Sequence, residues 1–322
     1  MTLLAGIDIG GTKCAVCLAR LAGDGPQVLE RVQFTTPDSP ERALEQLAAG
    51  LAALLERVPG ERLRAVGVSC GGPLDSARGL VLSPPNLPGW DSVDVLAPFR
   101  ERWQVPAALQ NDANACALAE WRWGAGRGCR SLVFLTFGTG MGAGLILDGR
   151  LYSGASDMAG EVGHVRLADD GPPGYGKRGS FEGFCSGGGI ARLAQARALA
   201  AIQDGHPPAF CPTLAGLEAI TAEAVGLAAQ GGDSLALEIF EAVGRSLGRG
   251  LAILVDVLNP ERIILGGIYG RQQALLEPVA LAVLRAEAHP HALDACRVVP
   301  AGLGESVGDY AGLAVALAAL EG

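Results

Sequence analysis

The sequence has few aromatic residues, few charges and few histidines. Aromatic side chains make up 5% and charged side chains 18% of the 322 residues, and there are 4 histidines. Lys and Arg number 25 against 34 Asp and Glu, so the net charge is −9, and the basic residues are dispersed rather than clustered. We therefore expect no nucleic acid and no membrane surface as partner, and a small molecule as ligand.

Long apolar runs and a secretory leader are also missing. No apolar run is long enough to span a bilayer, and the first apolar stretch has no basic leader and is interrupted by Asp8. The 8 cysteines are scattered through a chain too long to need a disulfide framework, so we expect reduced thiols in a cytoplasmic protein. Cys14 and Cys17 form one C-x-x-C, but they lie three apart on an expected strand, and no second pair completes a metal set.

Glycine, in contrast, is abundant, with 47 residues gathered in short clusters between apolar runs. Strand-like runs alternate with helical patterns, which indicates an α/β fold. The expected strands are 3–9, 14–21, 28–35, 65–69, 107–110, 131–137, 143–147, 150–152 and 262–265. The expected helices are 40–57, 113–123, 214–229, 236–258, 273–288 and 306–320, and segments 71–89 and 169–179 are expected as loops.

The length favours two lobes with a cleft between them, because single cores usually stop growing at a smaller size. In each half a strand enters a glycine turn, at Gly10 or at Gly138, and leaves as another strand, which indicates an internal duplication. We expect a small N-terminal α/β lobe of residues 1–115, completed by a C-terminal helix over 305–322, and a large α/β lobe of residues 116–304.

The segment Gly6-Ile-Asp-Ile-Gly-Gly-Thr-Lys13 is the first candidate phosphate site. It is not a P-loop, because the spacing is wrong and a strand follows instead of a helix. A glycine turn between two strands leaves backbone N–H groups to approach phosphate oxygens. Asp8 just before it suits a Mg²⁺ ion held through water. A plain hairpin without ligand remains the alternative.

A second glycine turn lies at Phe137-Gly-Thr-Gly-Met-Gly-Ala-Gly144. Gly138, Gly140 and Ala143 satisfy the G-x-G-x-x-A dinucleotide fingerprint, which must open a helix. Here the following residues have a strand pattern, so a second phosphate-facing hairpin is preferred. Two such hairpins, one in each half, can hold a polyphosphate.

Gln110-Asn-Asp-Ala-Asn-Ala115 places Asp112 at the start of a helix. Capping by Asn111 or Asp112 is the structural alternative, and capping and catalysis can coexist. A helix N-terminus favours an ionised carboxylate, as a proton acceptor requires, and strand ends in open α/β sheets face clefts.

Gly160-Glu-Val-Gly-His164 pairs an acid with an imidazole, and Glu182 follows in Gly179-Ser-Phe-Glu-Gly183. Carboxylates, amides and imidazoles exchange hydrogen bonds with adjacent sugar hydroxyls, which also suits Asn86 and Asn111. A structural histidine with Glu161 as its partner is the alternative.

Together these motifs resemble the ROK family of bacterial sugar kinases and repressors, related to hexokinase and actin. The match runs nearly end to end and covers Asp8 to Lys13, Asn86-Leu-Pro-Gly-Trp90, Asn111-Asp-Ala-Asn114, Gly138-Thr-Gly-Met-Gly142, Gly160-Glu-Val-Gly-His164, Ile264-Leu-Gly-Gly267 and the closing helix after Ser306. The resemblance implies a two-lobed actin-like (ribonuclease H-like) ATPase fold with a duplicated β/α core and an inter-lobe cleft. It also implies ATP with Mg²⁺ and a homodimer, which the prevalence of two-fold dimers favours too.

The implied reaction is ATP-dependent phosphorylation of a hexose hydroxyl, commonly O6, with Asp112 as the base and glucose as first candidate. The implied sugar contacts are Asn86, Asn111, Asp112, Glu161, His164 and Glu182. The implied phosphate and adenosine contacts are Gly10, Gly11, Thr12, Lys13, Gly138, Thr139, Gly140, Gly266 and Gly267.

Family members often carry three cysteines after this Gly-Glu-x-Gly-His motif, and with the motif's histidine these bind a structural zinc. Here the cysteine positions hold Pro173, Tyr175 and Ser180, so we expect no zinc and expect His164 to serve the sugar alone. A repressor would need a helix-turn-helix before the first glycine motif, which begins within ten residues of Met1, so a repressor is not expected. A sugar sensor without catalysis, or a polymerising actin-like ATPase, remains open.

Overall fold

The structure is a computed structural model that describes residues 2–23 and 25–321. Two compact units are formed, unit 1 from Met1–Arg130, Gly144–Ala159 and Gly302–Gly322, and unit 2 from Ser131–Ala143 and Gly160–Ala301. The expected lobe boundary at residue 115 falls inside α3 (Asp112–Trp123), which belongs whole to unit 1. The C-terminal helix expected over 305–322 is α11 (Val307–Glu321), and residue 322 lies outside the described residues. The division into lobes stays a prediction.

Unit 1 is built on a five-stranded sheet of order β3-β2-β1-β4-β8. Its strands are β1 (Thr2–Ile9), β2 (Lys13–Ala22), β3 (Gly25–Thr35), β4 (Leu63–Cys70) and β8 (Ala107–Asn111). β1, β4 and β8 run parallel to one another, β2 pairs with β1 antiparallel, and β3 pairs with β2 antiparallel at the edge of the sheet. Asp8 pairs with Ser69, which pairs with Gln110, so the carboxyl ends of the three parallel strands lie level.

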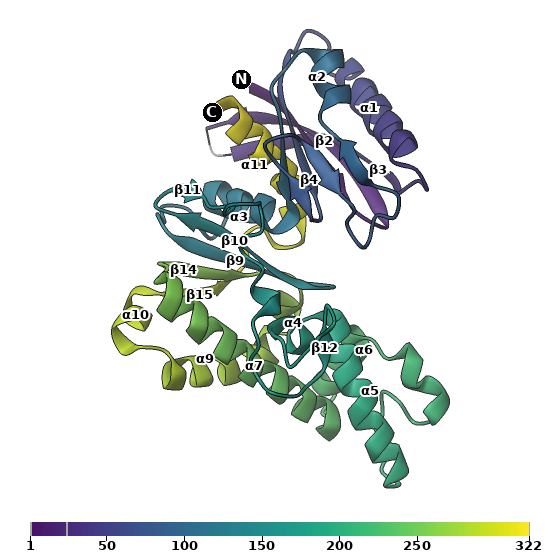
Figure 1. The fold of residues 1–322 in the computed structure, drawn as a ribbon, viewed down its shortest axis with the longest axis vertical. Helices are drawn as coiled ribbons and strands as arrows, with labels where there is room; N and C mark the ends of the chain where they lie inside the picture. The colour runs from purple at the N-terminus through teal and green to yellow at the C-terminus, as the bar shows by residue number, and fades with distance from the viewer. Residues whose placement is uncertain (1, 24, 322) are drawn as a thin grey trace. The chain divides into compact units, whose positions relative to one another are not determined.

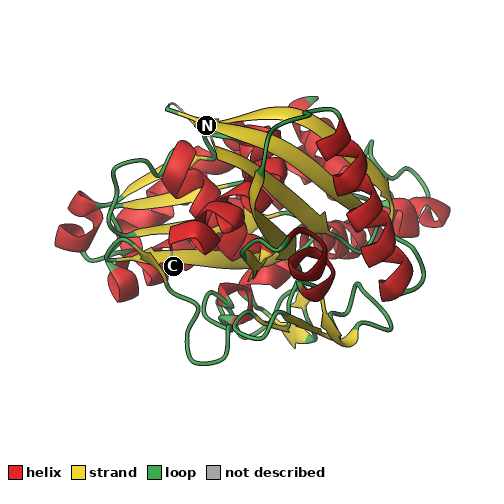
Figure 2. Ribbon diagram, turned by 90° about the horizontal axis from the view of Figure 1, so that it is seen from above, coloured by secondary structure: helices red, strands yellow, loops and turns green. Residues whose placement is uncertain are grey.

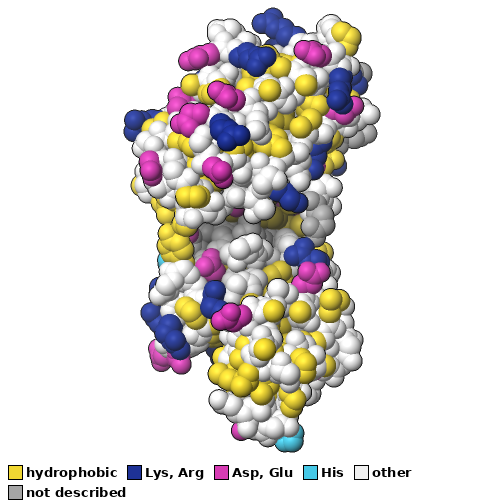
Figure 3. All heavy atoms as spheres, turned by 90° about the vertical axis from the view of Figure 1, so that its right-hand side faces the viewer, with side chains coloured by type: hydrophobic (Ala, Val, Ile, Leu, Met, Phe, Trp, Pro, Cys, Tyr) yellow, Lys and Arg dark blue, Asp and Glu magenta, His cyan; other side chains and the backbone are white. Residues whose placement is uncertain are grey.

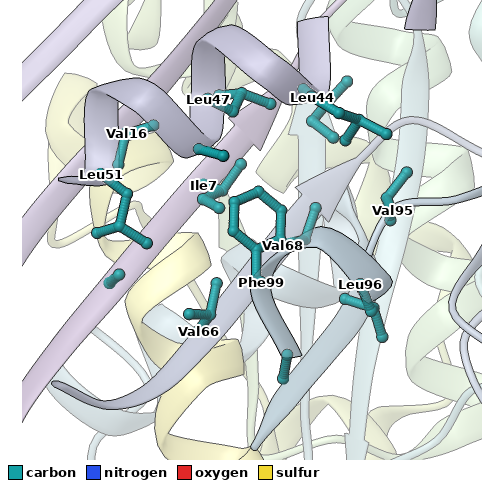
Figure 4. Close-up of a cluster of buried hydrophobic side chains, with 14 of the residues drawn as sticks. Ile7, Val16, Leu44, Leu47, Leu51, Val66, Val68, Val95, Leu96 and Phe99 are labelled. Atoms are coloured by element: carbon teal, nitrogen blue, oxygen red, sulfur yellow. The ribbon is translucent and has the colours of Figure 1, made fainter. Parts of the chain in front are cut away.

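One face of this sheet packs against α1 (Pro40–Glu56) and α2 (Ala97–Trp103) (Figure 1). Figure 2 distinguishes the helices, in red, from the strands, in yellow. Ser39 caps α1 by accepting a hydrogen bond from the Arg42 N–H, and Pro40 opens the helix, as expected. Buried residues recur along α1 every three or four positions, and they meet alternate residues of the strands. Figure 4 shows this core, in which Leu44, Leu47, Leu51 and Phe99 surround Ile7, Val16, Val66 and Val68.

The opposite face packs against α11 through small residues. A Cβ on Gly67 of β4 would lie 2.1 Å from the Gly312 oxygen, and one on Gly312 would lie 2.7 Å from the Ile7 nitrogen. Helix and sheet therefore approach each other backbone to backbone. Cys17 packs on this side and Cys14 on the α1 side, both buried, so the two C-x-x-C residues, three apart on β2, point to opposite faces of the sheet.

The segment expected as a loop over 71–89 contains part of a small antiparallel sheet, so that expectation was wrong. β5 (Leu74–Asp75), β6 (Leu80–Leu82) and β7 (Asp91–Asp94) form it in sequence order. Strands of two to four residues are too short to show an alternating pattern in the sequence.

The second five-stranded sheet has the order β11-β10-β9-β14-β15. Its strands are β9 (Leu132–Phe137), β10 (Met141–Leu147), β11 (Arg150–Leu151), β14 (Arg262–Leu265) and β15 (Arg297–Pro300). β9, β14 and β15 are parallel. Of these strands, β9, β14 and β15 belong to unit 2, β11 belongs to unit 1, and β10 is divided between the two units at Ala143. Unit 2 contains the helices α5 (Gly187–Gln203), α6 (Ala222–Gln230), α7 (Ser234–Leu258), α9 (Gln273–Glu287) and the short helices α4 (Phe181–Phe184), α8 (Ile268–Arg271) and α10 (Pro290–Ala295).

Several features of unit 2 differ from the expectations, and among them β15 and the short helices α4, α8 and α10 were not expected. The single helix expected over 214–229 is a 3-10 turn, η2 (Leu214–Ala219), followed by α6, because the Thr221 hydroxyl caps a new helix by accepting from the Ala224 N–H. α5 was not expected, since three glycines open it. The loop expected as irregular over 169–179 contains a hairpin of β12 (Pro173–Gly174) and β13 (Lys177–Arg178).

Charge distribution and the length of apolar segments are the two features on which the sequence-based expectations about partners rest. Figure 3 shows basic side chains interspersed with acidic ones on the face it presents. Within residues 2–23 and 25–321, no helix combines the length and the apolar character needed to cross a membrane.

Candidate active site

The expected site residues fall into two groups, one in each unit. In unit 1, Asp8 lies at the end of β1, and Asp112 begins α3 directly after β8. The Asp112 charge raises the pKa of Asp8, so the two carboxyls are electrostatic neighbours. Parallel strands that end level thus gather both acids at one sheet edge.

The start of α3 combines capping with the candidate base. Asn111 is the N-cap, and its Oδ1 accepts from the Asn114 N–H at 2.8 Å. The Asp112 Oδ1 accepts from the Ala113 N–H at 2.8 Å. Capping therefore falls to Asn111, which leaves the Asp112 side chain in the first turn of the helix.

Both acids have raised pKa values. The pKa of Asp8 rises from 3.8 to about 6, chiefly through burial and next through the charges of Asp112 and Asp309, with Arg31 opposing. Asp112 is accessible to solvent, but neighbouring protein atoms exclude part of the water, and this desolvation raises its pKa against two backbone hydrogen bonds that lower it. The direction of this pKa shift is opposite to the one expected from the sequence, where the helix N-terminus was expected to favour the ionised carboxylate of Asp112.

The first glycine turn is braced from within unit 1. The Gly10 N–H donates to the Lys13 oxygen at 3.1 Å, and the Thr36 hydroxyl donates to the Gly10 oxygen at 2.6 Å. The Gly10 N–H is therefore engaged inside the turn, whereas Gly11, Thr12 and Lys13 are exposed. Thr36, which directly follows β3, was not predicted.

Asn86 and Asn111 lie around one glycine pair. A Cβ on Gly71 would lie 3.6 Å from the Asn86 Nδ2, and one on Gly72 would lie 4.0 Å from the Asn111 Nδ2. A Cβ on Gly11 would lie 2.4 Å from the Asn86 oxygen, so the phosphate turn touches the Asn86 backbone. Unit 1 therefore brings together Asp8, the Gly10 turn, Asn86, Asn111 and Asp112.

In unit 2, the second glycine turn is linked to Glu182. The Gly138 N–H donates to the Gly140 oxygen at 3.1 Å, and the Glu182 Oε2 accepts from the Met141 N–H at 3.1 Å. A Cβ on Gly140 would lie 2.9 Å from the same Oε2. One carboxylate thus touches the phosphate-type turn directly, which the sequence did not predict.

Glu161 and His164 flank a single 3-10 turn, η1 (Val162–His164). The His164 N–H donates to the Glu161 oxygen at 3.1 Å, Glu161 is exposed and His164 is half-buried. A Cβ on Gly163 would lie 2.3 Å from the Met141 oxygen and 3.2 Å from the Glu182 Cβ. The turn and Glu182 therefore lie against the start of β10 together.

Gly266 and Gly267 follow β14. Gly267 has a φ of 63° and caps α8, and a Cβ there would lie 2.2 Å from the Phe137 oxygen. The Gly187 N–H donates to the Gly138 oxygen at 2.8 Å. Gly267 and the N-terminus of α5 therefore both adjoin the second glycine turn.

The residues present do not fit a zinc ion. Pro173 lies in β12, Tyr175 is in the hairpin turn, and the Ser180 hydroxyl caps α4 by accepting from the Gly183 N–H at 3.1 Å. Within the part of the chain that the structure describes, no three His, Cys, Asp or Glu side chains are grouped as metal ligands would be. All eight cysteines, which lie within the described residues, are free thiols.

Known proteins resemble the chain over nearly its whole length. The glucokinase of Streptomyces coelicolor is 31% identical over 290 residues, which cover 87% of this chain and 86% of that protein. The structure of a ROK family glucokinase from Streptomyces griseus in complex with glucose and AMPPNP is 30% identical, with a TM-score of 0.77 over 98% of this chain and 99% of that one.

A ROK family transcriptional regulator, a homologue of the E. coli Mlc protein, superimposes with a TM-score of 0.85 at 25% identity, over 99% of this chain and 78% of that one. The fold is therefore the two-lobed actin-like ATPase fold of the ROK kinases, as expected. The model of the ROK family matches residues 4–319. The chain belongs to the ROK family.

Proposed function

We propose that this protein is an ATP-dependent sugar kinase that phosphorylates a hexose hydroxyl, with glucose as the first candidate. The observation that carries the proposal is Asp112, an accessible carboxyl with a raised pKa at the start of α3, electrostatically coupled to Asp8 beside a glycine turn. The similarity to glucokinases over nearly the whole chain supports the same activity.

Asp112 acts as the general base. It accepts the proton of the attacking sugar hydroxyl while the sugar oxygen bonds to the γ-phosphorus of ATP and the bond to the β-phosphate oxygen breaks, which leaves ADP. A raised pKa brings a carboxylate closer to the working pH and makes it a better proton acceptor. The sugar contacts are Asn86, Asn111, Asp112, Glu161, His164 and Glu182.

The two glycine turns and the Gly266-Gly267 pair bind the nucleotide through Gly10, Gly11, Thr12, Lys13, Gly138, Thr139, Gly140, Gly266 and Gly267. Lys13 is exposed next to the first turn and brings a positive charge to the phosphates. Asp8 and Asp112 bring negative charge to one sheet edge, which fits a divalent cation near Asp8. Bound Mg²⁺ would neutralise phosphate charge in the transition state.

The test is sugar-dependent ADP release, measured with glucose, N-acetylglucosamine, N-acetylmannosamine, mannose, fructose and allose. We expect release with at least one sugar and a loss of at least about 100-fold in kcat for Asp112→Asn, the usual scale for a removed general base. Asp148→Asn, an exposed acid in the turn between β10 and β11, is the matched control. Near-normal activity of Asp112→Asn would exclude Asp112 as the base.

A sugar-binding regulator is the second candidate, because the Mlc homologue superimposes with the TM-score of 0.85. It predicts sugar binding in calorimetry without any ADP release. We also propose a homodimer acting in the cytoplasm, a setting in which eight free thiols stay reduced. Sedimentation velocity tests the dimer.

A further inference from the structure

The β12–β13 hairpin has a turn residue of an unfavourable type. Gly174 pairs with Lys177, so Tyr175 and Gly176 alone form the connection, with φ angles of 45° and 76°. Two-residue hairpin turns with both φ positive favour Asn-Gly, because a bulky side chain with positive φ is strained. A tyrosine at this position indicates that its ring has a task that outweighs the strain.

The Tyr175 ring meets His164. The two ring centroids lie 5.1 Å apart with an interplanar angle of 79°, an edge-to-face contact, although Tyr175 is 67% exposed. Two residues further on, the Lys177 Nζ donates to the His164 backbone oxygen at 2.6 Å. The hairpin therefore holds both the imidazole ring and the backbone of the same residue.

The hairpin is itself anchored in unit 2. The Arg192 Nε donates to the Pro173 oxygen at 3.0 Å, and the Arg166 Nη1 donates to the Arg178 oxygen at 3.0 Å. A Cβ on Gly174 would lie 2.4 Å from the Gly183 nitrogen, so β12 lies directly on α4, which carries Glu182. A hairpin fixed at its base in this way can transmit its position to His164.

ROK relatives with the cysteine motif hold this histidine with zinc, and the residues of this chain do not fit that metal. The substituted positions are in the hairpin itself, Pro173 in β12 and Tyr175 at the tip, with Ser180 at the cap of α4. Tyrosine and proline offer no thiolate for a tetrahedral site.

We propose that the β12–β13 hairpin fixes His164 without a metal, with Tyr175 and Lys177 as positioning residues for sugar binding. Tyr175 sets the plane of the imidazole, and Lys177 sets the backbone from which it projects. The inference rests on the proposed function only in that His164 contacts the sugar; the contact between hairpin and histidine is independent of any activity.

The first experiment compares Tyr175→Asn with Tyr175→Phe by NMR of the histidine Cε1 protons. The chain has 4 histidines, and the His164 signal is assigned by its loss in His164→Gln. Asparagine suits the positive φ, so the hairpin of Tyr175→Asn should be at least as stable as that of the wild type. We expect the His164 signal to move in Tyr175→Asn through loss of the ring current, and to stay in Tyr175→Phe. An unmoved signal in Tyr175→Asn would overturn the proposal.

The second experiment compares Lys177→Met with Arg178→Met. Both remove one positive charge from β13, but the Arg178 side chain pairs with Asp170 rather than with His164. We expect a rise of about fivefold in KM for the sugar in Tyr175→Asn and Lys177→Met, equivalent to roughly 1 kcal/mol of binding, with KM for ATP unchanged. Arg178→Met should match the wild type. Equal effects of Lys177→Met and Arg178→Met, or equal rises in both KM values, would contradict a positioning role.

Treatment with EDTA in the absence of added metal completes the test. The His164 signal should not change, because the β12–β13 hairpin fixes His164 without a metal. A shift that zinc reverses would overturn the proposal. If no sugar supports ADP release but the NMR shifts occur as expected, the kinase assignment is wrong and the role of the hairpin in positioning His164 is supported. If ADP release occurs and the His164 signal of Tyr175→Asn does not move, the kinase assignment is supported and the role of the hairpin is wrong.

Discussion

Asp8 carries a charge that the folded protein disfavours. Its pKa rises from 3.8 to about 6 through burial and the Asp112 charge, so the folded state binds a proton more tightly than the unfolded chain does. As pH rises from about 4 to about 6, the unfolded state releases this proton first, and the free energy of unfolding falls. Above pH 6 the full penalty remains.

Asp8→Asn should therefore stabilise the protein at pH 8 and have little effect on stability at pH 4. Asparagine keeps the shape without the charge, so we expect a gain of about 2 kcal/mol at pH 8, somewhat less than the shift alone implies because Asp8 is partly exposed. Urea unfolding at the two pH values measures it, with pH 4 as the internal control. Equal stabilisation at both pH values would show that the charge is not the cause. In the proposed kinase this variant should lose activity.

At the residue scale, the sequence predicts the polar side chains of the candidate site better than it predicts the residues that hold them in place through hydrogen bonds. Asp8, the Gly10 turn, Asn86, Asn111 and Asp112 occur together in unit 1 because a motif after a strand end fixes its place at the sheet edge. Thr36 and Lys177 reach their partners through hydrogen bonds to backbone oxygens, which leave no sequence pattern. The roles of all these residues stay predictions.

At the element scale, two glycines of α11, Gly308 and Gly312, differ in how closely they approach the strands β1 and β4. The three atoms nearest to a Cβ on Gly312 would be backbone atoms of Ile7 and Gly6, at 2.7 to 3.0 Å, whereas nothing lies within 4 Å of a Cβ on Gly308. Gly312→Ala should cost about 1–3 kcal/mol because the backbone cannot yield, while Gly308→Ala should gain about 0.5–1 kcal/mol from helix propensity. Thermal unfolding of both variants measures this. A loss in Gly308→Ala equal to that in Gly312→Ala would refute close approach as the cause.

The end of α3 offers a second prediction. Glu120 is fully buried, and its carboxyl oxygens accept three backbone N–H groups, from Ala125 at 2.7 Å, Gly302 at 3.0 Å and Leu303 at 2.9 Å. In Glu120→Gln an NH2 group replaces one acceptor and faces these donors. We expect a loss of about 2–3 kcal/mol, since buried donors are left unpaired.

Glu241→Gln is the matched control, because it removes only an exposed ion pair with Arg245 on α7 and should change stability by less than about 0.5 kcal/mol. Both variants are compared by denaturant unfolding. Equal losses would mean that the buried hydrogen bonds of Glu120 contribute nothing beyond a surface pair.

The long elements were predictable because their patterns are long. α1, α3, α7, α9 and α11 occur within a few residues of their expected bounds, since buried positions recur over several turns. β5, β6, β12 and β13 were missed because two or three residues cannot show a period. α5 begins with three glycines, which oppose a helix until Ser186 caps it by accepting from the Gly189 N–H at 2.9 Å.

At the scale of the whole molecule, unit 1 is assembled from three separate segments. The last of them, Gly302–Gly322, supplies α11, which covers one face of the β1–β4 sheet, and the two backbone donors at Gly302 and Leu303 that pair with Glu120. This helix was expected from the sequence and assigned to the N-terminal lobe, and in the structure α11 packs on β1 and β4, which lie nearly 300 and about 250 residues earlier in the chain.

A chain that ends at Ala301 should therefore lose the order of unit 1 and keep that of unit 2. Without residues 302–322, Leu4, Cys17 and Ala65 are exposed and the Glu120 carboxyl loses two hydrogen-bond donors. The contacts between α7 and α9 are unaffected. Hydrogen exchange should show fast exchange in β1 and β4 and slow exchange in α7 and α9. A chain ending at Leu320, which loses the ion pair of Arg122 with Glu321, should exchange like the full protein. If β1 and β4 stay protected without residues 302–322, unit 1 does not depend on its last segment, and the close packing at Gly67 and Gly312 contributes little to its stability.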